Sequence, residues 1–151
     1  MLWITRERPK IDRIACPWLV SRFVDTKAQF LFVPTAQVMS QANALRAIPF
    51  DVPGVELTHV GDRCSFDAIL AKYRLSTHGL ARLAAIVRGA DTDSLHLAPE
   101  CAGLLAVSLG LSTVIADDHE LLRLGMRIYD GLFAFCQLEP AEPHAWPPVS
   151  T

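Results

Sequence analysis

The chain has 151 residues, of which 51% are hydrophobic and 20% charged, and this length and composition suit one compact domain with a sizeable core. Its 14 basic and 16 acidic residues give a formal net charge of −2, and no basic run is long enough to follow a phosphate backbone, so direct nucleic-acid binding is not expected. Residues 1–10 bring in charge at Arg6 before an apolar core of signal-peptide length can form, which predicts a cytoplasmic protein without an export signal.

The first strands and helix are predicted from two short apolar runs and the segment between them. Residues 2–5 and 30–34 are rich in β-branched and aromatic side chains and are ended by charge or proline, which is typical of strands. Between these runs, apolar residues recur at helical spacing. They predict a helix that starts between Asp12 and Cys16, with Pro17 in its first turn.

The remaining elements are mostly helical. Residues 37–47 predict a weak amphipathic helix, and residues 48–61 predict two short strands or extended segments around a Pro-Gly turn. Helices are then predicted from a Ser65 cap onward, from residue 80 to about 89, from just after Pro99 to Gly110, and from a cap at Asp117 or Asp118 to residue 136.

This order of elements predicts an α+β fold, in which a mainly helical second half packs on a few short N-terminal strands. Residues 1–138 are expected to form a single domain, and residues 139–151, with four prolines, an irregular tail. The uncharged stretch 101–116 is shorter than the roughly 20 residues that a bilayer needs. We therefore expect a buried helix and the turn after it, and no contact with a membrane.

Four cysteines, Cys16, Cys64, Cys101 and Cys136, show neither metal-type CxxC spacing nor the density of a secreted disulfide scaffold, which favours free thiols in a reducing compartment. In the segment GDRCSFD, residues 61–67, Cys64 stands at a predicted helix start beside Arg63. Amide dipoles and a guanidinium would lower its pKa and make it a nucleophile or a redox thiol. The alternative is a small buried residue, because free cysteine is often buried.

The segment DRIACPWLVSR repeats this arrangement around Cys16. Arg13 precedes the thiol and Arg22 follows it, and arginines that converge with helix-start amides can bind a tetrahedral oxyanion. The alternative is a solvated ion pair of Arg22 with Asp12 or Asp25.

A third polar segment, RGADTD, places Arg88, Asp91 and Asp93 straight after a helix. It lacks the glycine and distal glutamate of a calcium loop, and an Asx turn is the alternative to a cation site. The wider set of residues that could ligate a divalent metal ion is His59, Asp62, Asp93 and His119, although no pair has diagnostic spacing.

Several separate blocks of the sequence resemble the C-terminal domain of the ChrB chromate resistance proteins. The blocks are TRERPKIDRIACPWLVSRFVD, IPFDVPGVELTHVGDRCSFDA, ARLAAIVRGADTD, LAPECAGLLAVSLGLS and DDHELLRLGMRIYDGLFAFC, and the resemblance covers about residues 3–137. It implies an intracellular domain associated with chromate resistance, which in full-length relatives follows an N-terminal DNA-binding regulatory region.

The resemblance and the polar segments together suggest a domain that binds a chromate-like oxyanion or a metal ion in an Arg/Cys/Asp pocket. Two alternatives belong to other classes: a thiol-dependent reductase of chromium(VI) or another electrophile, and a non-catalytic interaction module for a DNA-binding regulator. The expected roles are anion binding by Arg13, Arg22, Arg63 and Arg88, orientation by Asp67 and Asp91, thiol chemistry at Cys64 and Cys16, and metal ligation by His59, Asp62, Asp93 and His119.

Overall fold

Strand β1 (Leu2–Arg6) is the centre of a small sheet, and its alternating side chains serve two cores. The computed structural model describes residues 1–138, and all three strands in that range run parallel in the order β2-β1-β3. Trp3 and Ile4, neighbours on β1, belong to different apolar clusters. The flanking strands are β2 (Gln29–Val33) and β3 (Ile48–Pro49).

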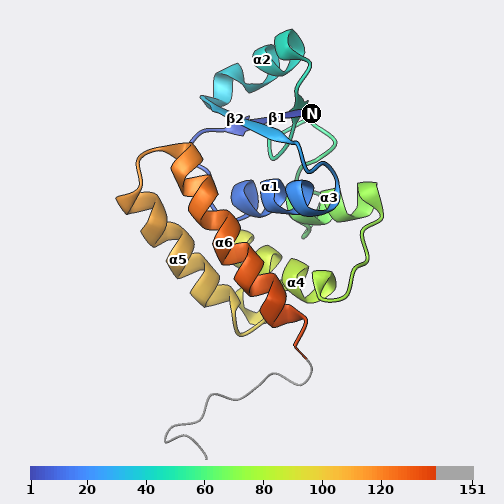
Figure 1. Ribbon diagram of the computed structural model, residues 1–151, viewed down its shortest axis with the longest axis vertical. Coiled ribbons are helices and arrows are strands. Elements are labelled where there is room, and N and C mark those ends of the chain that lie inside the picture. Colours follow the sequence, from blue (N-terminus) through green and yellow to red (C-terminus); the bar gives the residue numbers. More distant parts are fainter. Residues whose placement is uncertain (139–151) are drawn as a thin grey trace, which may run out of the picture.

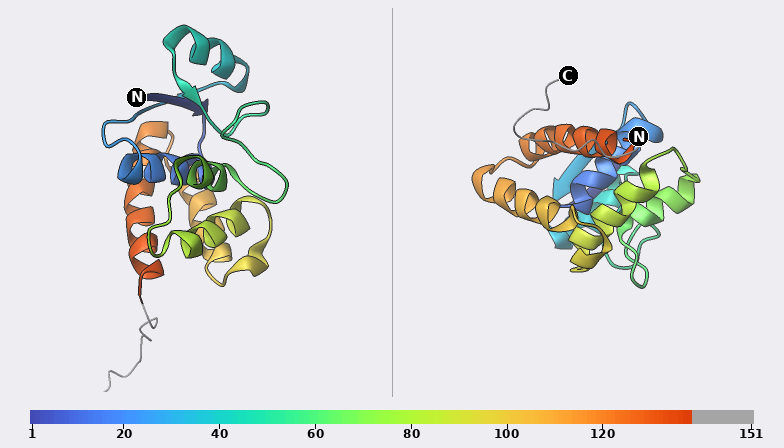
Figure 2. Two further views of the ribbon diagram at one scale, coloured as in Figure 1. Left: turned by 90° about the vertical axis from the view of Figure 1, so that its right-hand side faces the viewer. Right: turned by 90° about the horizontal axis from the view of Figure 1, so that it is seen from below.

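Parallel neighbours require crossover connections, and helices supply them. Helix α1 (Asp12–Phe23) joins β1 to β2, and α2 (Val38–Leu45), preceded by a short 3-10 turn at Thr35–Gln37, joins β2 to β3. The two helices cover opposite faces of the sheet (Figures 1 and 2), because α2 packs on the cluster that contains Ile4 and α1 on the cluster that contains Trp3.

Four further helices make up the second half of the chain and enlarge the core on the α1 side (Figures 1 and 2). They are α3 (Ser65–Tyr73), α4 (Leu80–Asp91), α5 (Cys101–Val114) and α6 (Asp118–Cys136), with a 3-10 turn at Leu95–Leu97 before α5. The α+β fold with a mainly helical second half is thus confirmed. The predicted tail, residues 139–151, lies outside the described residues.

Two helix boundaries and the position of Pro17 differ from the predictions. Helix α1 begins at Asp12, within the predicted range, but Pro17 then lies in its second turn and leaves the Arg13 carbonyl without its usual helical donor. The cap of α3 is Cys64, one residue before the predicted Ser65, because the Asp67 carboxylate accepts the Cys64 amide hydrogen. Helix α5 continues past Gly110 to Val114, since an exposed glycine costs a helix only about 1 kcal/mol.

Two other expectations need correction. Of the segment 48–61, only Ile48–Pro49 is a strand, and single bridges, such as Phe50 with Leu57, order the loop that follows. Helix α5 was expected to be buried, yet only Cys101 and Leu104 are, and Val114 is 78% exposed. It lies at the edge of the helical half (Figure 2), where no other helix of residues 1–138 covers its outer side. No helix among residues 1–138 has the length and apolarity to cross a membrane.

Helix α6 crosses α1 closely at Gly125. A Cβ added there would lie 2.3 Å from Ile14 Cγ2, whereas one added at Gly131 on the same helix would have no neighbour within 4 Å. We expect Gly125→Ala to lower the free energy of unfolding by about 1–3 kcal/mol. The matched variant Gly131→Ala should raise it by up to about 1 kcal/mol. Guanidinium denaturation measures both, and equal effects would contradict this helix contact.

Candidate metal centre

The polar cluster lies where β1 and β3 end. Both strands run parallel, so their carboxyl ends share one edge of the sheet. In the order β2-β1-β3 the connection from β1 leads away to β2, so the crevice beyond β1 and β3 is a topological switch point, the usual ligand position in parallel sheets. Asp51 follows β3 here, and Asp12 begins α1.

The His59 ring stands at the centre of the cluster. Its Nε2 atom lies near one carboxylate oxygen from each of three aspartates: 3.2 Å from Asp12 Oδ2, 3.4 Å from Asp51 Oδ1 and 3.0 Å from Asp91 Oδ2. These residues come from the start of α1, the chain after β3, the loop before α3 and the end of α4. Side chains far apart in sequence therefore converge on one point.

Hydrogen bonds from neighbouring groups fix the orientation of two of these carboxylates. Asp51 Oδ2 accepts a hydrogen bond from Arg6 Nη2 at 2.7 Å and lies 3.2 Å from Arg13 Nε. Its other oxygen accepts one from the Ser65 hydroxyl at 3.0 Å, and the Ser65 amide donates to Asp12 Oδ2 at 3.2 Å. The donors hold both aspartates with one oxygen toward His59.

Burial and crowding of like charges change the acidity of the cluster. Burial, and then the charges of Asp12 and Asp51, raise the pKa of Asp91 to about 7. The hydrogen bond with Asp12 is the main cause that raises the pKa of His59 to about 9. Burial also raises the pKa of Asp51, although Arg6 opposes this. Such a set of groups favours the presence of a positive charge at its centre, whether a proton or a cation.

Cys64 borders the cluster, but not as the predicted thiolate. It lies at the N-cap of α3, and its Sγ atom is within 4.8 Å of ligand atoms of Asp12 and Asp91. The residue is fully buried, however, and burial followed by the charges of Asp12 and Asp67 raises its pKa far above that of an ordinary thiol. Burial likewise raises the pKa of Cys16. Cys64 does stand at the start of α3, but its burial and raised pKa contradict the accessible thiolate and agree with the alternative of a small buried residue.

Asp67 pairs with Arg88, one of the predicted arginines, through both of its carboxylate oxygens. Its oxygens accept hydrogen bonds from Arg88 Nε at 2.8 Å and from Arg88 Nη2 at 2.6 Å. Burial alone would raise the pKa of Asp67, but the hydrogen bonds and charge of Arg88 outweigh it, and the pKa is lowered. Arg63 lies 3.6 Å from the same carboxylate, with its side chain 62% exposed.

Several residues predicted from the sequence lie elsewhere. Arg22 forms an ion pair with Asp130 of α6, and not with Asp12 or Asp25, which are the partners of the alternative interpretation. His119 packs its ring against Phe32, with centroids 5.4 Å apart. Among residues 1–138, Asp62, Asp93 and His119 belong to no set of three or more residues whose ligand atoms lie within 4.8 Å of one another.

Sequence reasoning missed Asp51 and gave Asp12 only a structural role. Asp51 follows a short apolar run that could be a strand, and Asp12 stands at a predicted helix start, and aspartates are common in both places. These two positions are the signal that the sequence carries for the site. It becomes specific only when β1 and β3 are known to be parallel neighbours.

The fold and the site define a small α+β domain with a carboxylate–histidine cluster at the edge of a parallel sheet. The family model described as "ChrB, C-terminal domain" matches residues 3–136, and the chain belongs to this family. A curated relative, Protein ChrB of Cupriavidus metallidurans, is 35% identical over 132 residues, which are 87% of this chain and 39% of the relative. No solved structure matches. The resemblance to the ChrB family is thus confirmed over nearly the whole chain.

The thiols provide a direct check of the buried arrangement. All four cysteines are free and buried, so Cys64 and Cys16 should resist iodoacetamide at neutral pH in the native protein and react fully after unfolding in guanidinium. Peptide mapping by mass spectrometry assigns each label. Rapid native labelling of Cys64 would contradict this environment.

Proposed function

We propose that the domain binds a divalent transition-metal cation through Asp12, Asp51 and His59, whose ligand atoms lie within 4.8 Å of one another, with Asp91 and Cys64 as further candidate ligands beside them. The observation that carries this proposal is the convergence of three carboxylate oxygens on one imidazole nitrogen at 3.0, 3.2 and 3.4 Å. His59 can offset the negative charge of the aspartates only when its imidazole ring is protonated. A metal cation would take over that charge and leave the imidazole free to ligate.

The spacing of the donor atoms fits a shared ion. Zinc lies about 2.0–2.2 Å from nitrogen and oxygen ligands, so the ligand atoms of a tetrahedral site are about 3.4 Å apart. The distances from His59 to the Asp12 and Asp51 oxygens, 3.2 and 3.4 Å, are close to this value, and the ligand atoms of these three residues lie within 4.8 Å of one another. A surface pocket lined by Arg6, Asp51 and His59, among others, opens beside the cluster and offers access from solvent.

The donor chemistry narrows the class of cation. Carboxylate oxygen and imidazole nitrogen suit Mn²⁺, Fe²⁺, Co²⁺ and Zn²⁺, whereas Cu⁺ prefers thiolate and thioether sulfur. Arg6 and Arg13 contact Asp51 and offset part of the negative charge of the carboxylates. Such outer contacts commonly tune affinity by holding ligands in place.

A chromate-like oxyanion is the second candidate ligand, and a groove between α3 and α4 favours it. Arg63 and Arg88 both line this groove, together with Asp67 and the residues that begin α4. Arg63 has the freer guanidinium, because Arg88 is held by Asp67 through two hydrogen bonds. Titration with sulfate, comparing the wild type with Arg63→Gln, distinguishes this anion site from the cation site.

The remaining alternatives have less support. A thiol-dependent reductase needs an accessible thiolate, and Cys16 and Cys64 are buried thiols of raised pKa. The chain spans 39% of the length of its curated relative. If the domain only binds a ligand, another region or protein would convert that binding into a response. A DNA-binding regulator is the partner class that the family resemblance implies.

The first test is metal affinity. Isothermal titration of the metal-free protein with Zn²⁺ and Mn²⁺ should show one site, weakened at least about tenfold in His59→Gln and Asp51→Asn, because each variant removes a ligand. The control His119→Gln changes a histidine outside the cluster and should bind like the wild type. Equal affinity in all four proteins, or no binding by the wild type, would refute the proposal.

The second test uses pH. The folded-state pKa of His59 is about 9, above its ordinary 6.5, so its contribution to stability is complete below pH 6.5 and is lost as pH rises through 9. The raised pKa of Asp91, about 7, acts in the same direction between pH 3.8 and 7. In EDTA, the Tm of the wild type should therefore fall between pH 6.5 and 9 more than that of His59→Gln. Parallel curves would show that His59 is not held by the aspartates.

A further inference from the structure

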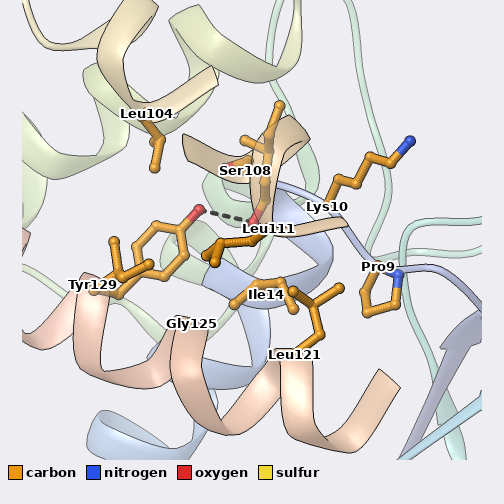
Figure 3. Close-up of a pocket in the computed structure, with 11 residues that line it drawn as sticks. Pro9, Lys10, Ile14, Leu104, Ser108, Leu111, Leu121, Gly125 and Tyr129 are labelled. Atoms are coloured by element: carbon orange, nitrogen blue, oxygen red, sulfur yellow. Dashed lines mark hydrogen bonds between the residues drawn. The ribbon is translucent and has the colours of Figure 1, made fainter. Parts of the chain in front are cut away.

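One peptide group joins helix α6 to the candidate metal centre. The carbonyl oxygen of Ile11 accepts a hydrogen bond from the Tyr129 hydroxyl at 2.9 Å (Figure 3). The amide of the same peptide, on Asp12, points to Asp91 Oδ1 at 3.5 Å. Carbonyl and amide point to opposite sides of a trans peptide, so this group connects Tyr129 on one side with Asp91 on the other.

The peptide is held in an unfavourable conformation. Ile11 has φ 47° and ψ −102°, a region that β-branched residues rarely enter and that costs about 1–3 kcal/mol. The conformation sets the direction in which Asp12, the next residue, enters the cluster. Contacts elsewhere must therefore keep Ile11 from relaxing.

Tyr129 is placed to provide such a contact. Its side chain is buried, and its hydroxyl donates to Ile11 across 118 positions of sequence. An apolar pocket lined by Ile14, Leu104 and Leu121, among others, adjoins the ring (Figure 3). Trp18 also packs near the ring, with centroids 6.4 Å apart, so apolar contacts hold the ring and the hydroxyl adds the polar contact to Ile11.

We propose that Tyr129 is a positioning residue for the metal centre, which holds the Ile11–Asp12 peptide so that Asp12 and Asp91 face a common cation. This inference rests on the proposed function. Without the hydroxyl, the peptide relaxes toward negative φ at Ile11, its amide turns away from Asp91, and the Asp12 carboxylate leaves the cluster. Metal affinity then falls although every ligand is still present.

The test compares two neighbouring residues of α6 that each bond to α1 or its cap. Tyr129→Phe removes the hydroxyl that bonds Ile11, and Asp130→Ala removes the acceptor of the Trp18 indole and of Arg22. Zn²⁺ titration should show an affinity about tenfold weaker in Tyr129→Phe and unchanged in Asp130→Ala. Thermal unfolding of both metal-free variants checks that they are folded.

A rescue experiment separates positioning from general packing. Glycine adopts positive φ without strain, so in an Ile11→Gly background the further change Tyr129→Phe should reduce Zn²⁺ affinity less than it does in the wild type. Wild-type affinity in Tyr129→Phe, or an equal loss in Asp130→Ala, would overturn the inference while the metal site stands. Absence of Zn²⁺ binding by the wild type would refute the proposed function, and this inference with it. If Ile11→Gly does not fold, the comparison of Tyr129→Phe with Asp130→Ala decides alone.

Discussion

The arrangement of this domain depends on the burial of carboxylates that cannot be left without donors. Asp12, Asp51 and Asp67 are each less than 10% exposed, and a buried charge without partners costs several kcal/mol. Their donors come from other elements: the Ser65 amide, the Arg6 guanidinium, and Arg88 on α4. Satisfying these groups ties β1, α1, α3 and α4 together around one edge of the sheet.

The same constraint explains why the edge of the sheet suits a cation. Parallel strands bring their carboxyl ends together, and the chain after β3 and the start of α1 each contribute an aspartate there. His59 adds a nitrogen from the loop before α3, and Asp91 closes the cluster from the end of α4. The donors that neutralise part of the acidic charge surround the aspartates and leave the centre to His59 or an ion.

The sequence predicted the fold class and most helices, because periodic apolar positions and caps are local signals. Asp117 does cap α6, as its position before the apolar stripe indicated. The candidate site was predicted only in part. His59 and Asp91 were chosen by residue type, but Asp12 and Asp51 acquire their role from strand pairing, which local patterns do not encode. For Cys64, the alternative of a small buried residue agrees with the structure, because burial and nearby acids raise the pKa of the thiol more than the helix-start amides lower it.

The central claim is that the cluster at the sheet edge holds a metal cation. A crystal structure of the protein with Zn²⁺, with anomalous diffraction recorded at the zinc edge, tests it most directly. The account predicts one strong anomalous peak within about 2.0–2.2 Å of His59 Nε2 and of oxygens of Asp12 and Asp51. A peak at other residues only, or a cluster in which His59 keeps its three aspartate contacts at saturating zinc, would contradict it.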